Sequence, residues 1–230
     1  MARAKQTLEP SFDKTCELIY KLASARISQK YDEWKKGQSY SNAMIEFYPT
    51  DRKLLGYVLK GESKKDNPYL LTPKLVEVCL EKLDFNDKNE VYWGQEDEIS
   101  SYLGGLFTTI LLEMQTYKDY TNNWMGVPLK TEREIRDFYC KFIHDKEDVC
   151  ESLKDDFVNF TYNSYEYFEL VDEVGDIVEK SVVQKDSNEV LTFHELPKKI
   201  TLYADKILFP FVSGICLNIL IDSFEEDSTE

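Results

Sequence analysis

The chain has 230 residues, of which 42% are apolar and 31% are charged. This length suits one large domain or two small ones, and 15 Tyr, 13 Phe and 3 Trp supply ample core, so a disordered chain is excluded. A surplus of 43 acidic over 28 basic residues gives a net charge of −15, which makes the chain as a whole unsuited to wrapping a polyphosphate. Two histidines and nine glycines argue against most metal, phosphate-loop and histidine-dependent mechanisms.

The cysteines and the apolar runs indicate the compartment. Five widely spaced cysteines are an odd number, which favours reduced core thiols over a disulfide framework. No apolar stretch follows Met1, so we expect no secretory signal. The longest apolar run, 207–221, is shorter than the ~20 residues of a membrane span, so we predict a buried core helix kinked near Pro210. We therefore expect a soluble, cytoplasmic protein without a membrane segment.

Charge divides the chain into two parts. Residues 1–80 hold 14 basic and 10 acidic residues, a net of +4, whereas the remaining residues carry −19. Such asymmetry indicates a nucleic-acid-facing part joined to something else, although a solvated acidic face gives the same pattern. The charge changes sign between Phe85 and Glu96, so we predict a helical bundle over 1–90 and an acidic helical domain over 91–230.

Helix signals dominate the first part. Ser11 is placed to cap a helix in which apolar residues recur every three or four positions from Phe12 to Ile27. Thr50 is the expected cap of a helix over 50–60, with Gly61 as its left-handed stop. Thr72 and Pro73 provide a cap and a proline at the first position of the next helix.

The second part is also predicted to be mainly α. Acidic residues 96–98 favour the start of a helix with apolar residues through Met114, and Thr131 with Glu134 forms a capping box. A long helix is expected to continue through Val171.

A small hairpin of 177–185 and 189–194 is possible after that helix. A final helix over 198–221 and a frayed acidic tail over 225–230 complete the predicted elements. The expected fold class is therefore mainly α.

Catalytic and metal motifs are weak. Cys140, His144 and Cys150 show the only metal-like spacing, but structural zinc sites pair two tight ligand dyads, so a buried cysteine beside a surface histidine is the preferred interpretation. His194 and Glu195 are neighbours, and neighbours on a strand point to opposite faces. We expect no enzyme activity, no metal and no cofactor.

An aromatic and acidic cluster is a candidate contact surface. Tyr162, Tyr165, Glu166 and Glu169 combine ring area with charge, and tyrosine is enriched at interface hot spots. The alternative is that half of the rings in this stretch lie in the core and half decorate the surface.

The segment PTDRKLLGYVLKGES, residues 49–63, followed by NPYLLTP, residues 67–73, and a helix, resembles the second half of a Cro/phage-repressor-type helix-turn-helix domain. With the VYWG stretch that ends at Gly94, it is similar to proteins of phages and mobile elements of Gram-positive bacteria. The resemblance covers roughly the first 95 residues. It departs from the family in lacking the usual Leu-Ala pair and in inserting about 20 residues after Gln29.

The resemblance implies a DNA-binding role for the helix over 50–60. It places Asp51, Arg52, Lys53, Gly56 and Tyr57 on the exposed face of a recognition helix, where Arg52 and Lys53 have the reach for guanine or phosphate. The residues expected to hold flanking phosphates are Lys60, Lys64 and Lys65. The scaffold can alternatively serve as a protein-docking module.

Two functions follow as hypotheses. The first is a regulator that binds DNA through the N-terminal bundle, as a homodimer reading two half-sites, while the acidic domain dimerises or contacts a protein partner. The second is a phage or mobile-element inhibitor in which the acidic domain imitates nucleic-acid charge or docks on a basic host nuclease, in the manner of an anti-CRISPR protein.

Overall fold

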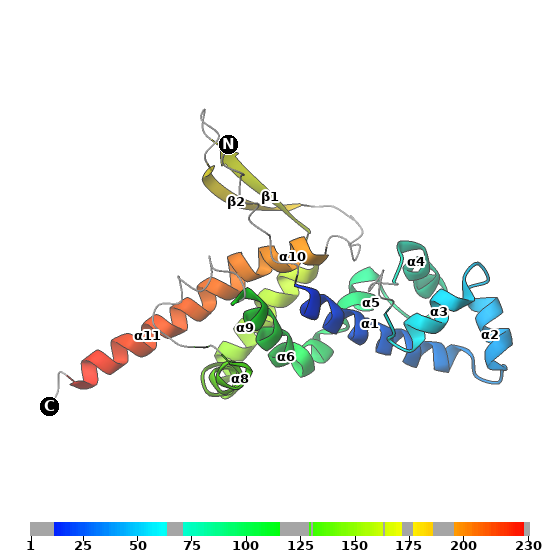
Figure 1. The fold of residues 1–230 in the computed structure, drawn as a ribbon, viewed down its shortest axis with the longest axis horizontal. Coiled ribbons are helices and arrows are strands. Elements are labelled where there is room, and N and C mark those ends of the chain that lie inside the picture. Colours follow the sequence, from blue (N-terminus) through cyan, green and yellow to red (C-terminus); the bar gives the residue numbers. More distant parts are fainter. Residues whose placement is uncertain are drawn as a thin grey trace, which may run out of the picture.

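A computed structural model describes residues 12–63, 71–115, 129, 131–162, 164–171, 177–185 and 196–227. The chain is mainly α-helical, as predicted. Figure 1 shows an elongated molecule in which the long first helix, α1 (Asp13–Trp34), lies near the middle. One end holds α2 (Tyr40–Phe47), α3 (Arg52–Leu59) and α4 (Pro73–Lys82), and the last helix, α11 (Phe209–Asp227), forms the other end. Between them lie α6 (Glu96–Met114), α8 (Glu132–Tyr139) and α9 (Glu147–Tyr162).

Helix α1 is the common partner of the α2–α4 end and the middle of the molecule. It packs against α3, α5 (Lys88–Trp93), α6 and α10 (Leu196–Tyr203). Its buried apolar side chains recur at the predicted helical spacing and are Cys16, Ile19, Tyr20, Ala23, Ile27 and Tyr31. The short helix α5 lies at the predicted change of charge, and the division of the chain at residues 90 and 91 stays a prediction.

A carboxylate from α6 caps the beginning of α1. Phe12 occupies the N-cap position in a left-handed conformation with φ +47°, and its side chain makes no capping hydrogen bond. Instead, Glu113 accepts hydrogen bonds from the backbone N–H groups of Lys14 (2.7 Å) and Thr15 (2.9 Å) and from the Thr15 hydroxyl (2.6 Å). The expected cap, Ser11, lies outside the described residues. A tertiary contact therefore satisfies the first turn of α1.

Most predicted helix ends are confirmed. Thr72 accepts a hydrogen bond from Leu75 N–H ahead of Pro73, and Thr131 and Glu134 form the capping box of α8. Gly61 has φ +63°, as expected of a left-handed stop. The predicted cap Thr50 is wrong, because the carboxylate that accepts from Leu54 N–H belongs to Asp51, three residues ahead of that amide.

The region after α9 differs from the prediction. The helix expected through Val171 ends at Tyr162, and β1 (Ser164–Val171) follows. Its antiparallel partner is β2 (Ile177–Lys185), so the hairpin pairs 177–185 with the segment before it, whereas 189–194 lies outside the described residues. Tyr, Phe and Val favour strands, and the apolar spacing of a short segment fits either period.

The last helical run is longer and more exposed than predicted. α10 continues through a π-helical turn, η2 (Ala204–Leu208), into α11 (Phe209–Asp227), so the expected frayed tail is helical at least to Asp227. The π-helical turn ends at Leu208, two residues before Pro210 and near the expected kink. The prediction of a buried core helix is wrong for one side, because Pro210, Gly214 and Leu217 are exposed. Lys199–Asn218 is long and apolar enough to cross a membrane by length and composition, and 33% of it is buried.

Candidate nucleic-acid interface

Helices α2 and α3 form a small two-helix unit joined by four residues, 48–51. Ser39 caps α2 by accepting a hydrogen bond from Asn42 N–H (3.4 Å). At the other end of α2, Lys82 of α4 donates to the carbonyls of Glu46 (2.6 Å) and Phe47 (3.2 Å). A cation at carbonyls that lack helical partners stabilises a helix C-terminus. Hydrogen bonds from side chains therefore stabilise both ends of α2.

The first turn of α3 presents two basic side chains to solvent. Arg52 and Lys53 are exposed, whereas Leu55 and Val58 are fully buried and pack the helix toward α1. Asp51 satisfies Leu54 N–H at 2.9 Å, so this end of the helix is ordered by its own sequence. The exposure expected for Arg52 and Lys53 is confirmed.

Two residues expected on the exposed face of α3 lie elsewhere. Gly56 is half-buried, and a Cβ atom at this position would lie 3.4 Å from the methyl carbon of Met44 in α2. Tyr57 is also half-buried against the core. The placement of both residues on the exposed face is therefore wrong, because α3 turns this side toward its neighbours. Gly56 is better explained as a close helix–helix contact than as a contact for a ligand.

The predicted phosphate contacts are partly described. Lys60 is exposed directly after α3, with its ammonium 3.9 Å from the carboxylate of Glu62. Exposed pairs of this kind contribute little stability, which leaves the cation available to a stronger anionic partner. Lys64 and Lys65 lie outside the described residues.

The predicted partner-binding cluster does not adjoin α3. Tyr162 is the last residue of α9, whereas Tyr165, Glu166 and Glu169 belong to β1 and lie opposite Gln184, Val183 and Lys180 of β2. Figure 1 shows this ribbon projecting from the α9–α10 side, away from α2 and α3. The two sets of candidate residues therefore belong to separate surfaces.

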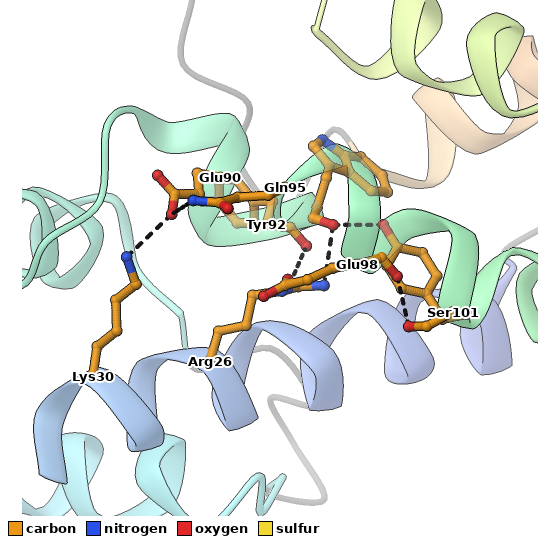
Figure 2. A network of polar contacts seen from close by, with 9 residues as sticks. Arg26, Lys30, Glu90, Tyr92, Gln95, Glu98 and Ser101 are labelled. Carbon is orange, nitrogen blue, oxygen red and sulfur yellow. Dashed lines mark hydrogen bonds and ion pairs between the residues drawn. The ribbon is translucent and has the colours of Figure 1, made fainter. Parts of the chain in front are cut away.

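The most connected polar site was absent from the sequence-based candidates. Figure 2 shows Arg26 of α1 reaching the end of α5, where its guanidinium donates to the carbonyls of Tyr92 (3.1 Å) and Trp93 (3.0 Å). The same guanidinium pairs with Glu98 of α6 at 2.5 Å. Tyr102 donates a second hydrogen bond to the Trp93 carbonyl at 2.6 Å. One arginine thereby joins three helices.

Glu90 of α5 is the buried acid of the same site, with 5% of its surface exposed. Burial by itself raises the pKa of Glu90, but hydrogen bonds from Asn86, Lys30 and Gln95 outweigh it and lower the pKa below 4.5. Asn86 N–H lies at 2.6 Å, and the Lys30 and Gln95 nitrogens each lie at 3.1 Å. Lys30 also donates to the Asp84 carbonyl. The carboxylate is therefore held ionised and fully bonded.

This junction has one local sequence signal. Asp87 caps α5 by accepting from Glu90 N–H at 2.9 Å, and a cap followed by an acid three residues later is readable from sequence. Arg26 and Lys30 lie about 60 residues earlier, with no local pattern that marks them as partners. We interpret the junction as structural, since every polar group named in it bonds to another part of the chain.

The spacing of Cys140, His144 and Cys150 does not correspond to a metal site in the described part of the structure. Within the described ranges, no group of three or more metal-ligating side chains comes together. Cys140 and His144 lie in a π-helical turn, η1 (Cys140–His144), and both are exposed. The expected surface histidine is confirmed, whereas the expectation of a buried cysteine is wrong for Cys140, because the turn points this residue to solvent. Burial raises the pKa of Tyr139 well above its usual 10.0, and the neighbouring thiol of Cys150 adds to this shift. The thiol of Cys150 thus faces a tyrosine hydroxyl.

Comparisons with protein families, with curated proteins and with solved structures return no match. The features of the chain that bear on function are therefore the exposed residues of α3 and the distribution of charge along the molecule.

Proposed function

We propose that the chain is a non-enzymatic DNA-binding regulator that contacts DNA through the beginning of α3. The observation that carries the proposal is the exposed pair Arg52 and Lys53 in the first turn of a short helix whose opposite side, Leu55 and Val58, is fully buried. Helix-turn-helix proteins read base edges with the N-terminal residues of a helix positioned in this way.

The arrangement of charge supports this orientation. The segment 1–80 has a net charge of +4, and its helices α2, α3 and α4 lie at one end of the long axis. The acidic helices α8 and α9 lie toward the other end (Figure 1). Charges farther apart than about 8 Å are largely screened at physiological salt. The acidic end therefore does not prevent DNA from approaching α3.

A matched pair of double variants tests the proposal. Arg52→Ala with Lys53→Ala should reduce retention of DNA from the chain's own promoter by about ten- to hundredfold, because a base-reading side chain contributes about 1–3 kcal/mol. Arg133→Ala with Arg136→Ala removes the same charge from two exposed positions of α8 and should leave DNA binding unchanged. If both double variants lost DNA binding equally, the loss would come from the change in net charge and not from the position of Arg52 and Lys53.

A second candidate function is supported by the exposed acids around α9. Asp145, Glu147, Asp148, Glu151 and Asp155 are all exposed. Such a surface complements a basic channel, and opposite charge accelerates association at low salt. In this alternative the chain inhibits a basic nuclease of a host defence system.

Charge reversal separates the two functions. If the chain is an inhibitor, Glu147→Lys with Glu151→Lys should slow association with a basic CRISPR-type nuclease and relieve its inhibition. Glu33→Lys with Glu77→Lys, at exposed positions near the other end, is the matched control. No inhibition by the wild-type chain at any salt concentration would remove this candidate.

A further inference from the structure

Helix α11 has an exposed side without charge. Other surface helices point charged or polar residues outward, as α8 does with Arg133 and Asp137. Between Ile207 and Ile221, α11 carries no charged residue. Leu217 is 44% exposed, Pro210 and Gly214 are exposed, and Phe211 is half-buried.

The body of the protein covers only one side of this helix. Leu208, Val212 and Cys216, each four residues apart, are buried on that side. Figure 1 shows the C-terminal half of α11 extending away from the other described elements. Asn218 is exposed beside Leu217, so the face is uncharged rather than wholly apolar. An exposed face without charge on a surface helix is a candidate interaction site.

The charges at the ends of the helical run indicate which partner covers it. By sequence, residues 196–206 contain three bases against one acid, whereas 222–227 contain four acids and no base. One of the three bases, Lys199, also donates to the Thr161 carbonyl of its own chain at 2.9 Å. A second copy aligned antiparallel brings each acidic end beside the basic end of its partner. A parallel alignment places like charges together. The helical run is therefore self-complementary in the antiparallel sense only.

The middle of the same run permits close approach. Gly214 is near the midpoint between Lys206 and Asp222, and a Cβ atom built on it would meet nothing within 4 Å. A small residue at a helix crossing lets the two backbones approach, and leaves room for a large neighbour such as Leu217 of the other copy. Two copies related by a two-fold axis need only one such patch.

A bilayer is a weaker partner for this face. The uncharged part, 207–221, is shorter than the ~20 residues needed to span a membrane. Insertion of the whole Lys199–Asn218 segment would also expose the side that packs on the protein through Leu208 and Val212. The four acids that follow are repelled by an anionic membrane surface.

We propose that the exposed side of α11 is the interface with a second copy of this chain, in which two α11 helices cross antiparallel near Gly214. The inference does not depend on DNA binding, although it names the dimer contact that a regulator reading two half-sites needs. The contact involves one helix about 28 Å long from each copy. A contact of one helix from each copy is small for a stable interface, so we expect weak and reversible association with a dissociation constant in the micromolar range.

Sedimentation equilibrium of the full chain between about 1 and 200 μM tests the association. The wild type should show a reversible monomer–dimer equilibrium, and Leu217→Glu should raise its dissociation constant about tenfold or more. Ile45→Glu is the matched control, since Ile45 is 47% exposed on α2, and it should leave the equilibrium unchanged. A wild type that stays monomeric throughout, or an Ile45→Glu effect equal to that of Leu217→Glu, overturns the proposal.

Cysteine cross-linking tests the antiparallel arrangement. In a Cys140→Ser background, which removes the exposed native thiol, Gly214→Cys should form a disulfide-linked dimer under mild oxidation and Glu226→Cys should not. Cross-linking at both positions indicates parallel helices and overturns the arrangement. Monomers that instead float with vesicles of phosphatidylcholine and phosphatidylglycerol, and lose this in Leu217→Glu, would show that the face binds a bilayer.

Discussion

Two regions of the molecule differ in how their side chains are covered. One is the junction of α1, α5 and α6, and the other is the exposed side of α11. At the junction, Arg26 and Glu90 are almost fully covered, and each bonds to several groups of the same chain. Along α11, apolar side chains such as Leu217 remain in contact with solvent.

This difference separates two kinds of stability. A buried charge is tolerated only when its partners are already in place, so the junction must be complete within one chain. An exposed apolar side chain has much the same contact with water in the folded chain as in the unfolded chain, so the monomer folds without a partner. Burying this side chain against a partner then lowers the free energy. Changes at the junction should therefore alter the unfolding free energy at every protein concentration, whereas changes on α11 should alter its dependence on concentration.

The largest effect is expected for Gly94→Ala. Gly94 has φ +79°, and a Cβ atom there would lie 2.0 Å from a Glu98 carboxylate oxygen and 2.6 Å from Arg26 Nε. Strained backbone and a broken ion pair should together lower the unfolding free energy by about 3–4 kcal/mol in urea titrations. Gly105→Ala, at an exposed site in α6 with open space around it, should raise it by up to about 1 kcal/mol. A similar loss of unfolding free energy in both variants would contradict the assignment of the Gly94→Ala effect to the junction.

Arg26→Lys should be nearly as damaging as Arg26→Ala. The guanidinium reaches two carbonyls and one carboxylate at once, and a lysine ammonium at one point does not reproduce this geometry. We expect a loss of about 2–3 kcal/mol for Arg26→Ala, measured by thermal and urea unfolding. Full retention of stability in Arg26→Lys would show that only the charge matters.

Glu90→Gln should give a smaller and pH-dependent loss. Because the pKa of Glu90 is lower in the folded chain than its usual 4.5, its ionised form stabilises the protein above that pH, and this contribution disappears as the pH falls through the folded value. The variant should be about 1–2 kcal/mol less stable near pH 7. The difference from wild type should shrink as the pH falls below the usual Glu pKa of 4.5 and the Glu90 carboxylate becomes protonated in the folded chain. A difference that is constant with pH would assign the loss to packing.

The smallest effect on the monomer is expected for Leu217→Ser. This side chain is 44% exposed, so the unfolding free energy at low protein concentration should change by less than about 0.5 kcal/mol. At high concentration the wild type should unfold at a higher temperature than the variant, because association stabilises only the folded state. If wild type and variant melted at the same temperature at every protein concentration, α11 would not take part in self-association.

The sequence by itself determined several of the helix ends and part of the buried faces. Thr72 with Pro73, Thr131 with Glu134, and Gly61 were readable because a cap or a left-handed stop involves residues within one helical turn. The exposure of Arg52 and Lys53 also followed from local spacing, since Leu55 and Val58 define the opposite side of α3. The mainly α fold class follows from the sum of such short-range signals.

The tertiary structure decided everything that depends on distant partners. Glu113 caps a helix that begins about 100 residues earlier, and Glu90 meets Lys30 across 60 residues, contacts that no local pattern encodes. The segment 164–171 became a strand because β2 supplies its hydrogen bonds. Apolar residues only require burial somewhere, so the sequence makes 207–221 apolar without specifying a cover. Packing buried Leu208, Val212 and Cys216 on one side of the last helical run and left Leu217 in solvent, because the described elements that contact this run lie on one side of it.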